Sequence, residues 1–418
     1  MAMLSETLKE RGYVHQFSAE KLEEITDGPK RTVYLGIDPS ADSLHAGNLM
    51  GLLILRHFLE DGHKIIILTG GGTGMIGDPG GKSEERNLLD EETVANNAKA
   101  VAAQIRQIFG SSDFTEENNA KWLAKLKLLD FLREVGKHFT INTMIKKDIV
   151  SERLKKESPI SYTEFSYSLL QGYDYLHLNE TYGCDVQVGG SDQWGNILAG
   201  VDFIRRTKEK TVYAFTWPLL VNKATGKKFG KSEQGAVWLD PKKTIPYQFY
   251  QFWLTVEDEM AEECLLKMTL LSKAEIDAVM HMHKRDKGER HPQRLLARTV
   301  TTLVHGEAAA EAAEAVSNVL FGGAAIADLS AVQREQLKMS APTFDVQVGT
   351  SLIDLLIQTK LASSKREAKQ FVSAKGVSIN QQVVTDAEAV LDPAHFQNGV
   401  ALLKRGKRTV VVLNLVER

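Results

Sequence analysis

Short apolar runs alternate with helix-like stretches through the first half of the chain. Val33–Gly36 and Ile65–Leu68 are apolar, and helical patterns follow them at about 49–59 and 90–109. Strands that are apolar throughout are typical of parallel sheets covered by helices on both faces. The alternation therefore predicts an α/β domain built on a parallel sheet.

The same domain is predicted to continue to residue 222. Cys184–Val188 is a further buried strand, and 213–221 returns to extended structure. Residues 223–236 contain a polar, Gly-containing and basic segment, which indicates a mobile loop. Further helices are predicted at 3–26, 122–135, 144–156, 163–175 and 196–206.

The second half of the chain changes pattern. Residues 237–320 are predicted to be largely helical, and Ser272 followed by Glu275 forms a capping box at the start of one helix. Residues 321–348 lack a sustained period and are predicted to be a linker. Residues 349–418 are predicted to form a separate small α+β domain, with a basic helix capped by Ser364.

Composition narrows the class of protein. The chain has 418 residues, of which 43% are hydrophobic and 25% charged, as expected for a globular protein of two or three domains. A net charge of -3 argues against coating nucleic acid by bulk charge, but not against local basic surfaces. The two cysteines are too few for a disulfide framework or a zinc site, and no signal peptide is recognisable, so the expected location is the cytoplasm.

Two glycine-rich motifs match familiar nucleotide sites but fail on context. Gly72, Gly74 and Gly77 have the spacing of a dinucleotide fingerprint, yet Pro79 prevents the helix that must begin there. Lys82 and its neighbours resemble the end of a P-loop, but the required first glycine is out of position. A dehydrogenase and a P-loop NTPase are therefore both disfavoured.

Residues 33–53 hold a third nucleotide-site pattern. A strand leads into a polar turn, and His45-Ala46-Gly47-Asn48 opens the apolar helix that follows. The start of a helix carries unpaired N–H groups and partial positive charge, which suit phosphate. A second motif, KFGKS at 228–232, lies on the basic loop late in the same domain.

Taken in order, these motifs resemble a class I aminoacyl-tRNA synthetase, and specifically the bacterial tyrosyl family. The quoted segments are YLGIDPSADSLHAGN, GMIGDPGGKSEER, YSLLQGYDY, QVGGSDQWGN and KFGKS. The resemblance implies a Rossmann-like catalytic domain at 1–222 and a mobile catalytic loop at 223–236. It also implies an α-helical anticodon-binding domain at 237–320 and a small ribosomal-protein-type RNA-binding domain at 349–418.

The resemblance assigns the ATP side of the reaction to two motifs. Attack of the tyrosine carboxylate on the α-phosphate needs no general base, so catalysis is expected from positioning and charge stabilisation. Asn48 stands where the family more often has a second His, and its amide can still donate one hydrogen bond. The implied catalytic residues are His45, Asn48, Lys82, Arg86, Lys228, Lys231 and Ser232. The implied ATP-binding residues are Asp38, Ser40, His45, Asn48, Asp192 and Lys231.

The resemblance also implies a tyrosine pocket. Tyr34 and Asp174 are expected to hold the phenolic hydroxyl, Asp78, Tyr167 and Gln171 the α-ammonium, and Gln193 the carboxylate region. Gly36 and Gly72 are expected to keep the floor of the pocket open. ATP is expected as a substrate with Mg²⁺ accompanying it, and no dedicated protein metal site is expected.

The small C-terminal domain is expected to bind RNA. Residues 349–418 hold ten basic and six acidic residues, a net charge of +4 against -7 for the remainder. Basic side chains there can contact phosphates. The candidate RNA-binding residues are Lys365, Arg366, Lys369, Lys375, Lys404, Arg405, Lys407 and Arg408.

The expected function is therefore a tyrosine–tRNA ligase with L-tyrosine, ATP and tRNA(Tyr) as partners. The resemblance implies a homodimer, with residues around 120–160 as candidates for the interface, and neither a membrane nor DNA as a partner. Two alternatives stay open from sequence: a non-catalytic RNA-binding protein derived from a synthetase, and another amino-acid-activating enzyme of the same fold, such as the tryptophan enzyme.

Overall fold

The computed structural model describes residues 3–79, 89–110, 113–221, 229–232, 235–406 and 409–416. The side chains of 148–149 and 231–232 also lie outside the description. The chain divides into two compact units. Unit 1 comprises 1–243 and 257–292, and unit 2 comprises 244–256 and 293–418.

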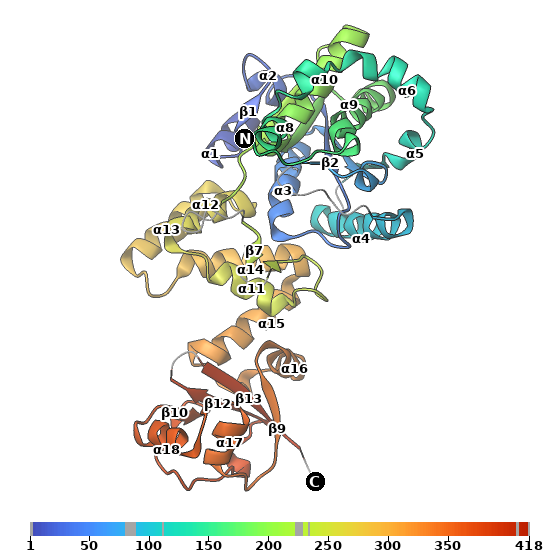
Figure 1. Cartoon of the computed structure of the whole chain (residues 1–418). Coiled ribbons are helices and arrows are strands. Elements are labelled where there is room, and N and C mark those ends of the chain that lie inside the picture. Colours follow the sequence, from blue (N-terminus) through green and yellow to red (C-terminus); the bar gives the residue numbers. More distant parts are fainter. Residues whose placement is uncertain are drawn as a thin grey trace. The chain divides into compact units, whose positions relative to one another are not determined.

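A six-stranded sheet forms the centre of unit 1 in the described residues (Figure 1). Its strands are β1 (Gln16–Phe17), β2 (Thr32–Ile37), β3 (Lys64–Thr69), β4 (Thr115–Asn118), β5 (Val186–Gly190) and β6 (Tyr213–Trp217). The order is β1-β6-β5-β2-β3-β4, and every neighbouring pair is parallel except β1 with β6. The predicted parallel sheet is confirmed.

Helices cover the two faces of this sheet because its strands are apolar on both sides. Val33 and Leu35 alternate with Tyr34 along β2, and all three are buried. Helix α3 (Ala46–Glu60) packs against β2 and β3, while α10 (Trp194–Lys208) packs against β5, β6 and α9 (Tyr162–Tyr182). The other helices described before residue 222 are α1 (Leu4–Glu10), α2 (Glu23–Thr26), α4 (Glu91–Phe109), α5 (Ala120–Leu123), α6 (Leu128–Glu134), α7 (Ile141–Met144) and α8 (Asp148–Lys155), with 3₁₀ turns η1 (Thr73–Met75), η2 (Gly136–His138) and η3 (Ser191–Gln193).

The predicted helix over 3–26 is wrong in its middle. The chain leaves α1 at Gly12, which has a φ of 68°, and then forms β1 beside β6 before α2. Pairing with a strand that is distant in sequence determines the conformation of this segment, and such pairing cannot be predicted from the local sequence pattern. Unit 1 also contains a separate two-stranded antiparallel sheet of β7 (Lys231–Ser232) and β8 (Gly235–Ala236).

The helical stretch predicted as one domain at 237–320 is divided between the two units. Helices α12 (Asp258–Met268) and α13 (Lys273–Arg285) belong to unit 1. Arg11 fixes α12 there, because its guanidinium donates to the carbonyl oxygens of Leu266 at 2.7 Å and Thr269 at 2.8 Å. The capping box of Ser272 and Glu275 begins α13 as predicted.

Unit 2 combines the remaining helices with a small five-stranded sheet in the described residues. Helix α15 (Glu307–Ser317) packs against α11 (Pro246–Leu254) and α16 (Ala331–Ser340), and runs into the π turn η4 (Asn318–Gly322). The other elements are α14 (His291–His305), η5 (Ile326–Asp328), α17 (Leu352–Gln358), α18 (Lys365–Ser373) and η6 (Pro393–His395), with strands β9 (Thr343–Val346), β10 (Val377–Ile379), β11 (Gln382–Val383), β12 (Val400–Arg405) and β13 (Thr409–Leu415).

The stretch at 321–348 differs from the predicted linker. It contains α16, which begins with a capping box of Ser330 and Gln333, and β9, which pairs in parallel with β13. The sheet order β11-β10-β12-β13-β9 makes β9 an edge strand of the small domain. The small domain therefore includes residues that precede 349. Among the described residues, no helix combines the length and apolar character needed to cross a membrane.

Candidate active site

The predicted site residues of unit 1 gather where three parallel strands end. Asp38 follows β2, Asp78 lies beyond the turn after β3, and Gln193 follows β5. Since β2 lies between β3 and β5, these three carboxyl ends are neighbours. Ligands of open α/β sheets bind at such an edge. Helix α9 packs against η1 and brings its polar face to the same place.

Asp174 is the most deeply embedded carboxylate of this site. It is 2% exposed, and it accepts hydrogen bonds from Asn119 Nδ2 at 2.8 Å and from Trp122 Nε1 at 2.7 Å. Burial raises the pKa of the Asp174 carboxyl to about 7, although these two donors oppose the rise. Tyr34 is 1% exposed, and its hydroxyl has no hydrogen-bond partner among the described residues.

Two further buried side-chain oxygens have no hydrogen-bond partner among the described residues. They are Gln171 Oε1 on α9 and Gln187 Oε1 on β5. Gln187 is paired in register with Tyr34 across the β2–β5 ladder, so both side chains project from the same face of the sheet. Buried polar groups are normally satisfied, so these oxygens are candidates for contacts with a polar ligand or water.

Asp38 connects α9 to the loop after β3. Its Oδ2 accepts from the hydroxyl of Tyr167 at 2.8 Å, and its Oδ1 accepts from Thr73 Oγ1 at 2.7 Å. Asn119 Nδ2 donates to Thr73 Oγ1 at 2.9 Å, so the Asp38 and Asp174 clusters are continuous. Asp78 accepts from Gln193 Nε2 at 2.6 Å.

The glycines after β3 allow this close approach. A Cβ atom on Gly70 would lie 2.0 Å from Asp38 Oδ1, and one on Gly71 would lie 2.3 Å from Asn118 Oδ1. A Cβ atom on Gly72 would lie 3.0 Å from Leu123 Cδ1, whereas one on Gly36 would meet nothing within 4 Å. The glycine-rich run thus serves packing around the site, and the space at Gly36 is open.

His45 and Asn48 form a reciprocal cap at the start of α3. The N–H of Gly47 donates to His45 Nδ1 at 3.1 Å, and the N–H of His45 donates to Asn48 Oδ1 at 3.0 Å. Nδ1 is therefore an acceptor, which leaves Nε2 as the donor of a neutral ring. The side-chain oxygen of Asn48 is likewise occupied as an acceptor, so the NH₂ group is the part of this amide that can donate.

The segment after the basic loop lies against this helix start. Ala46 N–H donates to Val237 O at 2.8 Å, and Leu239 N–H donates to Leu44 O at 2.8 Å. A Cβ atom on Gly230 would lie 2.6 Å from Gly47 N, and Gly230 has a φ of 92°. The HAGN and KFGKS motifs are thus adjacent at the backbone.

Several predicted residues cannot be placed in this site. Lys82, Arg86 and Lys228 lie outside the described residues, as do the side chains of Lys231 and Ser232. Ser40 is exposed in the turn after β2, where its N–H donates to Asp38 O at 2.8 Å. Asp192 lies half-buried in η3 beside Gln193. The described residues contain no cluster of three or more metal-binding side chains.

Sequence reasoning missed Asn119, Trp122 and Gln187. Gln187 carried a signal, because it is the polar residue of the otherwise apolar run Val186–Val188. Asn119 and Trp122 carried none, since only the folded chain brings them to Asp174.

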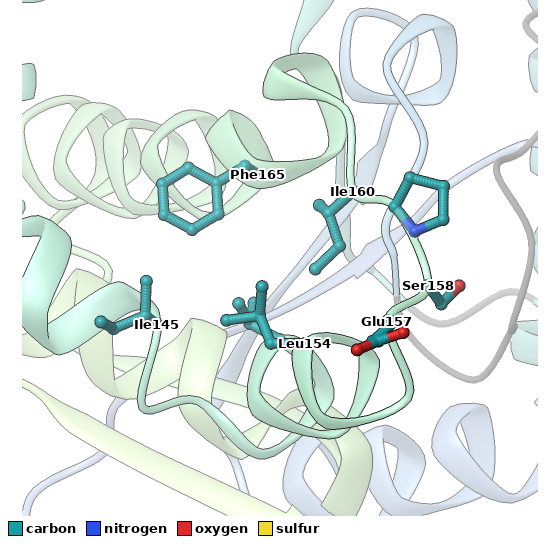
Figure 2. A pocket seen from close by; sticks show the side chains of 8 residues that line it. Ile145, Leu154, Glu157, Ser158, Ile160 and Phe165 are labelled. Atoms are coloured by element: carbon teal, nitrogen blue, oxygen red, sulfur yellow. The ribbon is translucent and has the colours of Figure 1, made fainter.

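A pocket of about 340 Å³ has a different lining from this cluster (Figure 2). It is lined by Ile145, Val150, Leu154, Glu157, Ser158, Pro159, Ile160 and Phe165. A buried ion pair lies nearby in sequence, between Arg153 and Glu164 at 3.1 Å. None of the predicted substrate residues lines this pocket.

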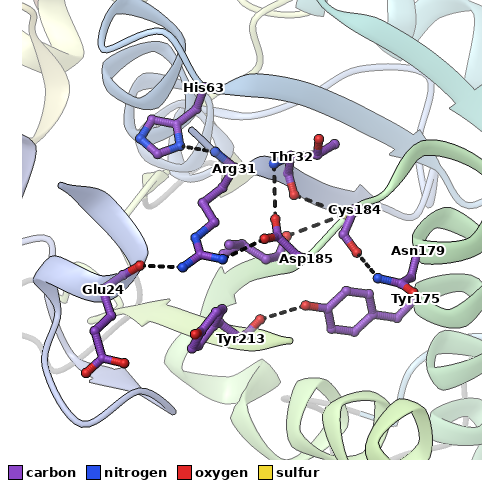
Figure 3. Close-up of polar contacts among 10 residues, drawn as sticks. Glu24, Arg31, Thr32, His63, Tyr175, Asn179, Cys184, Asp185 and Tyr213 are labelled. Atoms are coloured by element: carbon purple, nitrogen blue, oxygen red, sulfur yellow. Dashed lines mark hydrogen bonds and ion pairs between the residues drawn. The ribbon is translucent and has the colours of Figure 1, made fainter. Parts of the chain in front are cut away.

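The opposite edge of the sheet is held by a polar framework (Figure 3). Arg31 donates to Asp185 at 2.8 Å and lies over the ring of Tyr213 at 4.7 Å. Asp185 also accepts from the N–H of Thr32 at 3.1 Å, and His63 Nδ1 accepts from the N–H of Arg31 at 3.0 Å. These contacts tie the amino ends of the strands together and leave the carboxyl edge for the site.

The basic residues of the small domain fall into two groups. Lys365, Arg366, Lys369 and Lys375 are exposed, with Lys365 paired to Asp354 at 3.0 Å and Lys369 to Glu388 at 3.2 Å. Lys404 instead donates to Leu320 O at 2.5 Å, and Arg405 donates to Leu361 O at 2.6 Å. Lys407 and Arg408 lie outside the described residues.

Comparisons with known proteins agree with this arrangement. The family model described as "tRNA synthetases class I (W and Y)" matches residues 26–322, and "Tyrosine--tRNA ligase SYY-like C-terminal domain" matches 333–413. The chain is 45% identical to a tyrosine–tRNA ligase of Roseiflexus castenholzii, over 100% of both chains. It is 44% identical to one of Limosilactobacillus reuteri, over 98% of both.

A solved structure shows the same similarity. A C-terminally truncated mitochondrial tyrosyl-tRNA synthetase of Aspergillus nidulans aligns with a TM-score of 0.67 and 29% identity, over 75% of this chain and 92% of that one. The family models cover both the sheet domain and the C-terminal domain, and the relatives span the full length. The chain therefore belongs to the class I aminoacyl-tRNA synthetases, in the group of the tryptophan and tyrosine enzymes.

Proposed function

We propose that the chain is a tyrosine–tRNA ligase. It activates L-tyrosine with ATP to give tyrosyl-adenylate and pyrophosphate, and then transfers the tyrosyl group to the 3′-terminal adenosine of tRNA(Tyr). The observation that supports the choice of tyrosine is the buried hydroxyl of Tyr34, which has no partner among the described residues and shares a core with Trp122, the donor to Asp174. A phenolic hydroxyl can accept from Tyr34 and donate to Asp174.

The same two groups explain rejection of phenylalanine. A ligand without the hydroxyl would leave the Tyr34 hydroxyl without a partner and would desolvate the Asp174 carboxylate without adding a donor to it, at a cost of about 1–3 kcal/mol for each group. The fixed hydrogen bonds of Asn119 and Trp122 hold Asp174 in place for this purpose. Asp78, Tyr167 and Gln171 supply the carboxylate and polar groups for the α-ammonium, and Gln193 lies beside Asp78.

The start of α3 supplies donors for ATP. His45 presents Nε2–H because Nδ1 is occupied, and Asn48 presents its NH₂ group because its oxygen caps the helix. Asn48 thus replaces a second histidine as a neutral donor. Lys82, Arg86, Lys228 and Lys231 stabilise the pentavalent phosphate and the departing pyrophosphate. Mg²⁺ enters with ATP, bound mainly by phosphate oxygens and water.

Amino-acid-dependent exchange of labelled pyrophosphate into ATP tests this function. Exchange should occur with L-tyrosine and be at least 100-fold weaker with phenylalanine and tryptophan. Absence of exchange with tyrosine would overturn the proposal in favour of a non-catalytic protein, and preference for tryptophan would favour the sister enzyme. Tyr34→Phe should cut tyrosine-over-phenylalanine selectivity about fivefold, the equivalent of one hydrogen bond of about 1 kcal/mol.

The proposed assembly is a cytoplasmic homodimer. Support comes from the expected interface region, where Leu128, Leu129 and Ile141 are 71%, 78% and 58% exposed. Clustered exposed apolar residues mark interaction surfaces. Light scattering should give twice the chain mass for the wild type, and Leu128→Glu with Leu129→Glu should give monomer. A wild-type monomer at micromolar concentration would contradict this assembly.

A further inference from the structure

Lys147 is a mostly buried lysine beside the amino-acid end of the site. It lies between α7 and α8 and lines a small hollow with Tyr167 and Asn196. Among the described residues, its ammonium has one hydrogen-bond acceptor, Asn196 Oδ1 at 3.4 Å, and no carboxylate within 4 Å. A buried cation without an ion-pair partner is costly unless it has another role.

From Lys147 a chain of side chains leads to Asp78. Asn196 Nδ2 donates to Gln193 Oε1 at 3.4 Å, and Gln193 Nε2 donates to Asp78 Oδ2 at 2.6 Å. Each group donates to the next, from a cation at one end to a carboxylate at the other. The charged ends fix the direction of both amides, because a flipped amide would present a donor to the lysine or an oxygen to the carboxylate.

We propose that Lys147 is a positioning residue that acts through Asn196 to orient Gln193 and Asp78 for the α-amino and carboxylate groups of tyrosine. The inference rests on the proposed tyrosine activation. Lys147 itself need not contact the amino acid, because Asn196 and Gln193 separate it from Asp78. Burial lowers the pKa of Lys147 to about 8 and Asp78 opposes this shift, so the ammonium is charged at pH 7.

The stem of Lys147 lies beside the start of α10. A Cβ atom on Gly195 would lie 3.7 Å from Lys147 Cγ, which is an ordinary van der Waals distance. Gly195 and Asn196 belong to the first turn of α10, directly after Gln193 in η3. The lysine therefore acts on one short segment that holds two members of the chain.

The test is pyrophosphate exchange at pH 7 with Lys147→Met, Lys147→Arg, Asn196→Ala and the double variant Lys147→Met/Asn196→Ala. We expect Lys147→Met to raise the KM for tyrosine 5- to 20-fold, with less than a twofold change in the KM for ATP. Lys147→Arg should recover at least half of this loss on a logarithmic scale. Lys146→Met, at the exposed neighbouring lysine, is the matched control and should match the wild type.

The double variant separates this role from general damage. If the two residues act through one chain, the double variant should be no worse than the poorer single variant, whereas independent effects would multiply. Binding of 4-ethylphenol, which keeps the phenol but lacks both the α-amino and the carboxylate group, should be less than twofold affected by Lys147→Met.

Three outcomes would overturn the inference while leaving the proposed function intact. The first is unchanged tyrosine KM in Lys147→Met with wild-type exchange present. The second is a defect confined to the KM for tRNA, which would make the lysine an RNA contact. The third is multiplicative loss in the double variant. Loss of exchange in the wild type would instead reject the proposed function itself.

Discussion

At the scale of single residues, the proposed role of Asp174 makes recognition of the phenol dependent on pH. Burial raises the pKa of its carboxyl to about 7, so this carboxyl gains a proton as the pH falls below 7. The ionised carboxylate accepts a stronger hydrogen bond from a phenol than the neutral carboxyl does, so tyrosine binding should weaken toward low pH. Between pH 8 and pH 6 the dissociation constant for tyrosine should rise roughly tenfold, since about one-tenth of the carboxyl stays ionised at pH 6.

Calorimetric titration of the enzyme with tyrosine across this pH range checks the prediction. Phenylalanine serves as the internal control, because it makes no phenolic hydrogen bond and should lose less than twofold. An unchanged tyrosine affinity from pH 8 to pH 6 would show that the donors Asn119 and Trp122 keep Asp174 ionised against its burial.

The family resemblance placed Tyr34, Asp38, Asp78, Tyr167 and Asp174 at one site, and the structure brings Tyr167 close to Asp38, Asp78 and Asp174. The partners of these residues were not predictable. Tyr167 was expected at the α-ammonium and donates to Asp38, while Asn119 and Trp122 reach Asp174 from another part of the chain. Such contacts depend on where β4 and α5 pack, and neither has a strong local pattern.

At the scale of elements, α3 joins the proposed ATP site to the buried core. His45 caps its start, and His57 lies near its end with 9% exposure and no described partner for Nε2. Burial lowers the pKa of His57 to about 4, with Arg11 and Arg56 adding to the shift. The folded state therefore keeps His57 neutral where the unfolded chain, with a pKa near 6.5, takes up a proton.

This difference predicts a loss of stability as the pH falls from about 6.5 to 4. The depressed pKa means that the unfolded state binds more protons in this window, so the cost grows to at most about 3 kcal/mol at pH 4. His57→Leu should remove that part of the acid sensitivity. Urea unfolding at pH 7 and pH 4.5 measures it, and an equal loss in both proteins would contradict the assignment.

Strongly patterned elements were predictable, and short polar ones were not. Helix α4 begins after its cap Asp90 and ends at Phe109, as its Ala and Val spacing indicated. Strand β4 has the sequence TEEN, which is unfavourable for a strand, and it exists because β3 offers an open edge. The same reason explains β1 inside the predicted helix at 3–26: pairing with β6 outweighs local preference.

At the scale of the whole molecule, charge is divided unevenly along the chain. The +4 of residues 349–418 against -7 elsewhere predicted an RNA-binding surface, but sequence could not tell which lysines remain exposed. Lys404 is half-buried on Leu320 O, and burial lowers its pKa. The bond from Lys404 to Leu320 O connects the small domain to η4. Gln381 Nε2 adds a second connection nearby, because it donates to Ala324 O at 3.1 Å.

The two groups of basic residues should therefore respond differently to salt. Each phosphate contact that is lost lowers the slope of log K against log salt by about 0.7 to 0.9. Lys375→Met and Arg366→Met should each reduce the slope for tRNA binding by such an amount, because both side chains are exposed.

Lys404→Met should leave the slope unchanged and lower the unfolding free energy of the small domain by about 1–2 kcal/mol, since its charge is committed to a carbonyl. Filter binding from 50 to 300 mM salt, paired with urea unfolding, separates the two effects. A reduced salt slope for Lys404→Met, equal to that of Lys375→Met, would place Lys404 on RNA instead of on the domain joint.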